Sequence, residues 1–200
     1  MRVVMKFGGT SVGSVDAIRR VVEIVRGAAR QHRVVVVVSA MNASHIRTTD
    51  MLIGAARAAA AGDAEGAVRV TGQILAGHLG VAAELTSDQE RRALESFLRA
   101  TCGYVDDLLR SIAILGELTP RALDLISGQG ERCNARLVAA ALRSSGVSAE
   151  AVDATELIVT NERHGDASPL MDETRERSRR RLLPLLERGC VPVVTGCIGA

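Results

Sequence analysis

The segment 6–12 reads KFGGTSV and directly follows a short apolar run. It places a lysine, two glycines and two hydroxyl side chains where a strand is expected to pass into a helix. Glycine lets backbone N–H groups approach an anion closely, and a helix N-terminus favours negative charge. With the Lys6 ammonium group, this loop is suited to binding phosphate groups. Its spacing differs from GxxxxGK[ST], so it is not a Walker A loop.

Two interpretations of Lys6 stay open on the pattern alone. Lys6 ends an otherwise apolar strand. Burying an unpaired ammonium group costs free energy, so contact with a phosphate would explain this lysine. Alternatively, Lys6 extends to solvent beside an ordinary glycine turn, with its methylene stem over apolar surface.

Glu131 is the second candidate for a binding residue. On a helix it shares one face with apolar side chains such as Val138, and a carboxylate there lies at the wet margin or pairs with a cation. Gly130 leaves room for a small ligand, and a substrate ammonium group would be a suitable partner. The alternative, which we favour on the pattern alone, is a salt bridge to a nearby arginine such as Arg132 or Arg136.

Thr48, Thr49 and Asp50 open an apolar helical segment. We expect one threonine to be the N-cap and Asp50 to lie in the first turn, where a carboxylate suits the helix dipole. Capping alone would explain these residues, and so would substrate binding at a helix N-terminus.

The hydrophobic pattern predicts the elements that position these residues. Residues 2–7 are predicted to form a strand, and 34–38 are five consecutive valines, typical of a strand covered on both faces. Between them, Ser14 is a suitable N-cap for a helix with apolar residues at i, i+3, i+4 and i+7. Strand, helix and strand form a βαβ unit with a right-handed crossover.

The rest of the chain is predicted to be largely helical. Helices are expected over 48–61, 64–79, 88–115, 120–144 and 172–186, and strands over 149–152, 157–160 and 190–195. The predicted class is α/β with a helical insertion after the second strand. Ligands bind beyond the carboxyl ends of strands in such sheets, which selects the segments 6–9, 39–41 and 195–196.

Composition excludes several classes of function. The chain has 200 residues, 47% of them apolar, which is enough for one sizeable core. Its net charge is +2 and it has only three aromatic residues, so nucleic acid is not an expected partner. The basic run 175–181 contains Glu176 and fits a helical pattern, so a solvated helix face is the preferred interpretation.

Cysteine and histidine spacing predicts no metal site. The four cysteines lack CxxC spacing and the four histidines lack HExxH spacing, so reduced buried thiols in a cytoplasmic protein are expected. The apolar start is too short for a signal peptide. No apolar run approaches the ~18 residues that would span a bilayer, so no membrane partner is expected.

These segments together resemble the aspartate kinases of the amino-acid kinase family. KFGGTSV at 6–12 resembles the opening signature of the family, and VVVVSAM at 35–41 resembles its second strand and turn. GELTPRALDLISGQGER at 116–132 resembles the helix with the family's Ser-x-Gly-Glu element. IVTNERHGDASP at 158–169 and PVVTGCIG at 192–199 extend the resemblance over essentially the whole chain. It is strongest to the lysine-sensitive or bifunctional branch.

The resemblance implies a three-layer αβα sandwich with a mainly parallel sheet. Residues 1–200 would form the N-terminal, substrate-side part of the kinase domain, without the nucleotide-binding half and the ACT regulatory domains. The implied reaction moves the ATP γ-phosphoryl group to the β-carboxylate of L-aspartate, the first step toward lysine, threonine and methionine. ATP and Mg²⁺ are the implied cofactors, and the complete protein is expected to be a homo-oligomer.

The resemblance also assigns roles to residues of this chain. Lys6 would be the catalytic lysine that contacts phosphate, Thr49 the substrate threonine, and Glu131 the acidic residue that holds the aspartate amino group. The loop around the transferred phosphoryl group would comprise Gly8, Gly9 and Ser11. Such transfer depends mainly on positioning and charge neutralisation, for which a lysine and oriented N–H groups are suited.

The chain departs from the family pattern in two places. The link from the 39–41 segment to the threonines is longer, which keeps Thr48 as an alternative to Thr49. Ser127 lies one position before the expected serine, and Gly128 occupies its place. An aspartate kinase, or its N-terminal portion, is the leading hypothesis. The alternatives are a catalytically dead aspartate-binding or regulatory module, another amino-acid kinase, and a fragment without independent function.

Overall fold

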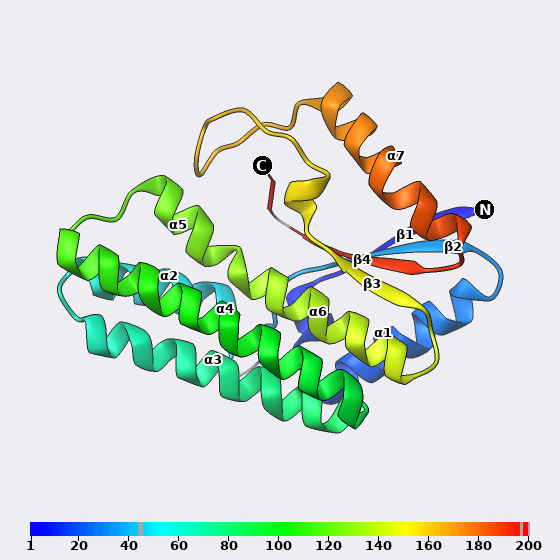
Figure 1. Cartoon of the computed structure of the whole chain (residues 1–200), viewed down its shortest axis with the longest axis horizontal. Helices are drawn as coiled ribbons and strands as arrows, with labels where there is room; N and C mark the ends of the chain where they lie inside the picture. The colour runs from blue at the N-terminus through cyan, green and yellow to red at the C-terminus, as the bar shows by residue number, and fades with distance from the viewer. Residues whose placement is uncertain (44–45, 197, 200) are drawn as a thin grey trace.

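The computed structural model describes residues 1–43, 46–196 and 198–199, and a four-stranded parallel sheet lies at its centre (Figure 1). The strands are β1 (Arg2–Phe7), β2 (Arg33–Val38), β3 (Ala149–Val152) and β4 (Val191–Thr195). Their order in the sheet is β1-β2-β4-β3, and all neighbouring strands are parallel. The predicted α/β class is confirmed.

The valine run forms β2, and both of its faces are covered, as the pattern predicts. Val34, Val36 and Val38 are buried in a core shared with helix α1 (Val15–Ala29). Val35 is buried in a second core on the opposite face, shared with helix α7 (Met171–Glu187). A strand inside a parallel sheet is expected to be apolar on both faces for this reason.

Helix α1 begins at the predicted cap. The Ser14 Oγ accepts a hydrogen bond from the Ala17 N–H at 3.2 Å, and Asp16 lies in the first turn. The apolar stripe of this helix faces the sheet, with four buried residues: Ile18, Val21, Val22 and Val25. The first βαβ unit is therefore confirmed.

The sheet is the middle of three layers. Helices α1 and α6 (Gln129–Ser144) pack on one face, and α7 packs on the other (Figure 1). Helix α6 contributes much of the shared core, including the fully buried Leu137, Val138 and Leu142. In its first turn, Glu131 lies close to Gly196, which directly follows β4.

A helical insertion follows β2 and has an apolar core of its own. It comprises α2 (Thr48–Ala60), α3 (Ala64–Leu85), α4 (Asp88–Leu115) and α5 (Pro120–Ser127). Figure 1 shows α2, α3 and α4 side by side, away from the strands. Helix α4 ends at Gly116, whose φ of +67° is the left-handed conformation that glycine adopts most easily.

The helix predicted over 120–144 is two helices. Thr119 is the N-cap as expected, and its Oγ1 accepts from the Ala122 N–H at 3.1 Å. Helix α5 then ends at Ser127 and α6 starts at Gln129. Gly128 separates them, and a methyl group there would lie 2.8 Å from Ile198 Cγ2. The glycine therefore admits a close approach of the segment after β4.

The strand predicted over 157–160 is wrong. The short 3-10 helix η2 (Ala154–Glu156) precedes this segment, and only Thr160 forms a bridge, with Pro169. Leu157 and Val159 are buried without belonging to a strand. The apolar pattern correctly predicted that Leu157 and Val159 are buried. They pack beside α7, however, and do not pair with a strand of the sheet.

Helix α7 carries the basic run on a solvated face, as predicted. Arg175, Glu176, Arg179 and Arg180 are exposed, and Arg181 pairs with Glu150 and Glu156. Across the described parts of the chain, no helix combines the length and the apolar character that crossing a membrane would require.

Candidate functional site

The register of the sheet brings three strand ends into one row. Phe7 at the end of β1 pairs with Val38 at the end of β2, and Val38 pairs with Thr195 at the end of β4. The turns that follow these strands therefore lie at the same edge of the sheet (Figure 1). The three segments selected from the sequence are together, as expected for parallel strands.

The predicted phosphate loop, residues 8–11, packs on the core through the buried Val12 that follows it and is exposed to solvent at Ser11. It leads into one turn of 3-10 helix, η1 (Gly9–Val12), in which the Ser11 N–H donates to the Gly8 carbonyl at 2.9 Å. Val12 is fully buried and anchors the turn, while Ser11 is exposed. Lys6 is also exposed and forms no hydrogen bond or ion pair with the described residues. Its ammonium group is therefore accessible to an anion at this edge.

The two glycines of the loop differ in their surroundings. A methyl group on Gly9 would lie 2.8 Å from the Ala40 carbonyl oxygen and 2.8 Å from Asn42 Cβ. A methyl group on Gly8 would meet nothing within 4 Å, and its φ of −71° suits any residue. The fold therefore requires Gly9 but does not require Gly8, where the open space would allow close approach of a ligand.

Glu131 lies in the first turn of α6 and is only 7% exposed. Its carboxylate abuts the turn after β4, because a methyl group on Gly196 would lie 3.2 Å from Glu131 Oε1 and 3.4 Å from Oε2. The carboxylate is thus at the same edge of the sheet as the phosphate loop.

The two arginines considered as partners of Glu131 are both engaged elsewhere. Arg132 Nε donates to Asp153 Oδ2 at 2.5 Å. The guanidinium carbon of Arg136 lies 4.0 Å from the centre of the Phe97 ring, a distance typical of a cation–π contact. The salt bridge from Glu131 to an arginine, which we favoured on the pattern alone, stays a prediction.

The threonine pair opens α2, but neither threonine is its N-cap. The N-cap is Arg47, whose side chain makes no capping hydrogen bond, so the capping prediction is wrong. Thr48 is fully buried, with its Cγ2 so close to Gly130 that a methyl group on that glycine would lie 2.8 Å away. Thr49 is exposed. Thr49 is thus accessible to a ligand, and its role as the substrate threonine stays a prediction.

Sequence reasoning missed two polar residues that hold the site together. Asn134 is fully buried in α6, and its Nδ2 donates to the Ser39 carbonyl at 2.6 Å. Asp153 follows β3 and holds Arg132. A signal for Asn134 was present, since it is a polar residue among apolar ones, one helical turn after Glu131.

The electrostatics of Asp153 follow from its contacts. Burial alone would raise the pKa of Asp153, but hydrogen bonds from Arg132 and Thr155 outweigh that effect and hold the pKa below its ordinary value. Asp153 therefore stays ionised at neutral pH, and the ion pair with Arg132 persists.

The described residues contain no cluster of side chains that would hold a metal ion without further ligands. Within 1–43, 46–196 and 198–199, no three His, Cys, Asp or Glu side chains converge as a metal would need. Mg²⁺ often binds through one or two carboxylates and the phosphates of a nucleotide.

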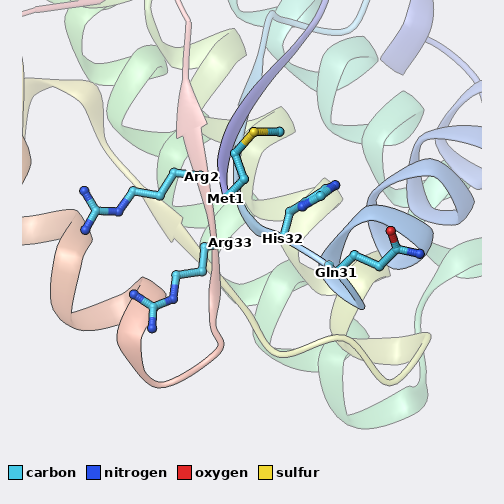
Figure 2. A pocket seen from close by; sticks show the side chains of 6 residues that line it. Met1, Arg2, Gln31, His32 and Arg33 are labelled. Atoms are coloured by element: carbon cyan, nitrogen blue, oxygen red, sulfur yellow. The ribbon is translucent and has the colours of Figure 1, made fainter.

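A hollow of the surface lies at the opposite end of the sheet. It measures about 460 Å³ and is lined by residues at the amino ends of β1 and β2. Figure 2 shows that Arg2 and Arg33 extend to one side of the strands, whereas Gln31 and His32 extend to the other. These polar groups do not converge, so the strand ends described above remain the candidate site.

Several aspartokinases are similar to this chain in sequence. The chain is 34% identical over 163 residues to the aspartokinase of Schizosaccharomyces pombe, and the aligned region covers 78% of this chain and 30% of that protein. It is 29% identical over 203 residues to the lysine-sensitive aspartokinase 3 of Escherichia coli, covering 99% of this chain and 41% of that protein. The chain thus spans less than half the length of these two relatives.

Solved structures share the fold. E. coli aspartokinase III in complex with aspartate and ADP superposes with a TM-score of 0.86 at 27% identity, covering 100% of this chain and 41% of that chain. The same enzyme in complex with lysine and aspartate gives a TM-score of 0.85 at 26% identity, covering 98% of this chain and 41% of that chain. The sequence model of the amino acid kinase family matches residues 1–200, and the chain belongs to that family.

Proposed function

We propose that this chain is the substrate-side part of an aspartate kinase, which transfers the γ-phosphoryl group of ATP to the β-carboxylate of L-aspartate. One observation carries the proposal: the phosphate loop and the Glu131 carboxylate lie at the same row of strand ends. The similarity to E. coli aspartokinase III, whose structure contains aspartate and ADP, supports aspartate and a nucleotide as the ligands.

Each site residue has a role within this proposal. The Lys6 ammonium group neutralises negative charge on the transferred phosphoryl group, and the N–H groups of the phosphate loop orient it. These loop residues are Gly8, Gly9 and Ser11. Glu131 binds the amino group of aspartate, and Thr49 contacts the same substrate from the start of α2.

The wider setting belongs to the same proposal. Mg²⁺ enters as the complex with ATP, and the complete enzyme is a homo-oligomer that acts in the cytoplasm on the route to lysine and threonine. Three free cysteines are buried, Cys102, Cys133 and Cys190, which supports a reducing compartment. The ligands proposed are L-aspartate and ATP, with no nucleic-acid or membrane partner.

The direct test uses the purified 200-residue chain. Binding of L-aspartate and of Mg–ATP is measured by calorimetry, and aspartate-dependent ADP release is followed in the same preparation. D-aspartate and L-glutamate serve as controls for selectivity. Stereoselective binding of L-aspartate supports the proposal. Binding of neither ligand by folded protein contradicts it. Binding of L-aspartate without turnover fits both a substrate-side part and an aspartate-binding module, which turnover by a complete version of the enzyme distinguishes.

Two variants separate the roles of the site residues. In a complete version of the enzyme, we expect Lys6→Ala to abolish phosphoryl transfer while aspartate affinity stays near that of the wild type. Glu131→Gln should weaken aspartate binding by about 2–5 kcal/mol, the usual cost of removing one partner of a buried charge pair. Glu23→Gln, on the exposed side of α1, is the control. Wild-type turnover in Lys6→Ala, or unchanged aspartate affinity in Glu131→Gln, would remove that residue from the site.

A further inference from the structure

We propose that Asn134 is a positioning residue, whose side chain holds the 39–42 turn against α6 and so fixes the phosphate loop relative to Glu131. The inference rests on the proposed function, because that function requires the nucleotide phosphates and the substrate to be held in one geometry. Asn134 would thus connect the phosphate loop and Glu131 without itself contacting ATP or L-aspartate.

The backbone of the 39–42 turn contacts the end of β1, the phosphate loop and the start of α2. The Ser39 N–H donates to the Phe7 carbonyl at 3.2 Å, which ties the turn to the end of β1. The Asn42 N–H donates to the Gly9 carbonyl at 3.1 Å, and the Thr48 N–H donates to the Met41 carbonyl at 3.2 Å. A displacement of this turn would therefore move the phosphate loop and the start of α2 together.

Asn134 supplies the side-chain hydrogen bond from α6 to this turn. It is fully buried, and its Nδ2 lies 2.6 Å from the Ser39 carbonyl oxygen, 95 residues away in sequence. Glu131 lies one helical turn before Asn134. The bond therefore fixes the helix that carries Glu131 relative to the turn that is hydrogen-bonded to the phosphate loop.

The other amide atom of Asn134 indicates that folding alone does not explain the residue. Its Oδ1 is buried and has no hydrogen-bond partner among the described residues. A buried acceptor without a partner destabilises a protein, and apolar groups of similar shape can be neutral or stabilising in its place. The neighbours along this face of α6, such as Leu137 and Val138, are apolar and fully buried. Asparagine at this position therefore costs stability through its unpaired Oδ1, and what it provides is the Nδ2 donor to the Ser39 carbonyl.

A positioning role predicts a particular kinetic pattern. Each ligand meets its own contacts, so loss of the Asn134 bond should leave the binding of each ligand alone nearly unchanged. Transfer between them requires near-attack geometry, and a misplacement of about 1 Å can cost 10²-fold in rate. In a complete version of the enzyme, we therefore expect kcat to fall by about 10- to 100-fold in Asn134→Ala, with KM for aspartate and for Mg–ATP within about 2-fold of the wild type.

The first test needs no activity. Hydrogen exchange of the backbone amides of Ser39, Asn42 and Thr48 is measured in the wild type, in Asn134→Ala and in Cys133→Ala. Cys133 is the buried neighbour of Asn134 on the same helix and serves as the control for truncation. We expect exchange at these three amides to rise by about 10-fold or more only in Asn134→Ala, while the β2 amides stay protected in all three proteins. Asn134→Val, which fills the space without a donor, gives the same comparison if the alanine variant folds poorly.

The second test is kinetic and decides the role. A fall in kcat at constant KM in Asn134→Ala and Asn134→Val, but not in Cys133→Ala, supports positioning. Unchanged exchange of the turn amides, or an equal loss of kcat in Cys133→Ala, overturns the inference. Failure of the wild type to bind L-aspartate would instead reject the proposed function, and the exchange experiment would still report whether Asn134 holds the turn.

Discussion

Arg132 and Asp153 join the helix that carries Glu131 to the end of β3. The Arg132 Nε lies 2.5 Å from Asp153 Oδ2, and the two side chains are only 26% and 24% exposed. Asp153 also accepts hydrogen bonds from the backbone N–H and the Oγ1 of Thr155. One carboxylate thus orders both the start of α6 and the first turn after β3, so the pair holds the edge of the candidate site opposite the phosphate loop.

Replacing Arg132 should destabilise the fold measurably at neutral pH. In Arg132→Met, Asp153 stays partly buried but loses its charged partner, and hydrogen bonds to charged groups contribute about 1.5–3 kcal/mol. We expect the free energy of unfolding at pH 7, measured by urea denaturation, to fall by about that amount. Arg175→Met is the control, because Arg175 and Asp172 form an exposed pair of a kind that contributes about 0–1 kcal/mol.

The effect of Arg132→Met should depend on pH in one direction. The native pKa of Asp153 is lower than its unfolded value, so its contribution to stability is present above the unfolded pKa and is lost as pH falls through the native one. The difference between the wild type and Arg132→Met should therefore shrink below about pH 4. A constant difference between pH 7 and pH 3 would show that Arg132 acts through packing instead.

The two glycines of the phosphate loop should respond differently to alanine. In Gly9→Ala the new methyl group would lie 2.8 Å from the Ala40 carbonyl oxygen, so the loop or the 39–42 turn must shift. Such overpacking costs about 1–3 kcal/mol. In Gly8→Ala the methyl group meets open space, so unfolding stability should stay within about 0.5 kcal/mol of the wild type. Thermal and urea unfolding of the two variants test this contrast.

Gly8→Ala should affect nucleotide binding even though it leaves the stability of the fold unchanged. If phosphate approaches the Gly8 backbone, a methyl group there occupies the space of the ligand, and Gly8→Ala should weaken Mg–ATP binding without loss of stability. Calorimetric titration with Mg–ATP measures this directly. Wild-type nucleotide affinity in Gly8→Ala would show that the open space above this glycine is not used.

Gly130 should tolerate no side chain, in contrast to a glycine of α4. A methyl group on Gly130 would lie 2.8 Å from Thr48 Cγ2 and 3.1 Å from Ala40 Cβ, so Gly130→Ala should destabilise by about 1–3 kcal/mol. Gly103 is exposed within α4, and a methyl group there meets nothing within 4 Å. Gly103→Ala should therefore stabilise by up to about 1 kcal/mol, the difference in helix propensity. Equal effects in both variants would contradict the tight contact between α6 and Thr48.

Local patterns predicted the parts of the fold that local physics determines. The valines of β2, the Ser14 cap and the periodic stripe of α1 each carry their own signal, because burial on both faces, an orphan N–H and a helical period are visible over a few residues. The parallel arrangement then placed the ends of β1, β2 and β4 at one edge, which located the candidate site.

The errors arose where tertiary contacts decide. The segment 157–160 has a strand-like composition, yet Leu157 is buried beside α7 without a neighbouring strand. The N-cap of α2 is Arg47 and not a threonine, and Thr48 lies inside the helix, buried against Gly130. Asn134 was missed because its bond joins residues 95 positions apart, and a spacing pattern within one helix carries no information about such a partner.

His78 should make the fold sensitive to mild acid. It lies in α3, is fully buried, and its Nδ1 lies 2.8 Å from the Ile74 carbonyl oxygen, so Nδ1 carries the proton. Nε2 is buried without a partner among the described residues. Burial lowers the pKa of His78 below its ordinary 6.5, and the hydrogen bond to Ile74 only partly offsets this.

The sign of this effect follows from proton linkage. Below pH 6.5 the unfolded chain binds a proton at His78 that the folded protein does not, so stability rises with pH and falls as acid is added. His78 should contribute a slope of up to about 1.4 kcal/mol per pH unit between pH 6.5 and its lower native pKa. His78→Met keeps a side chain of similar bulk and removes the titration, so its stability, measured by urea unfolding, should change less than that of the wild type between pH 7 and pH 5.5. Parallel curves for the two proteins over that range would show that the folded protein accepts the proton at His78 as readily as the unfolded chain does.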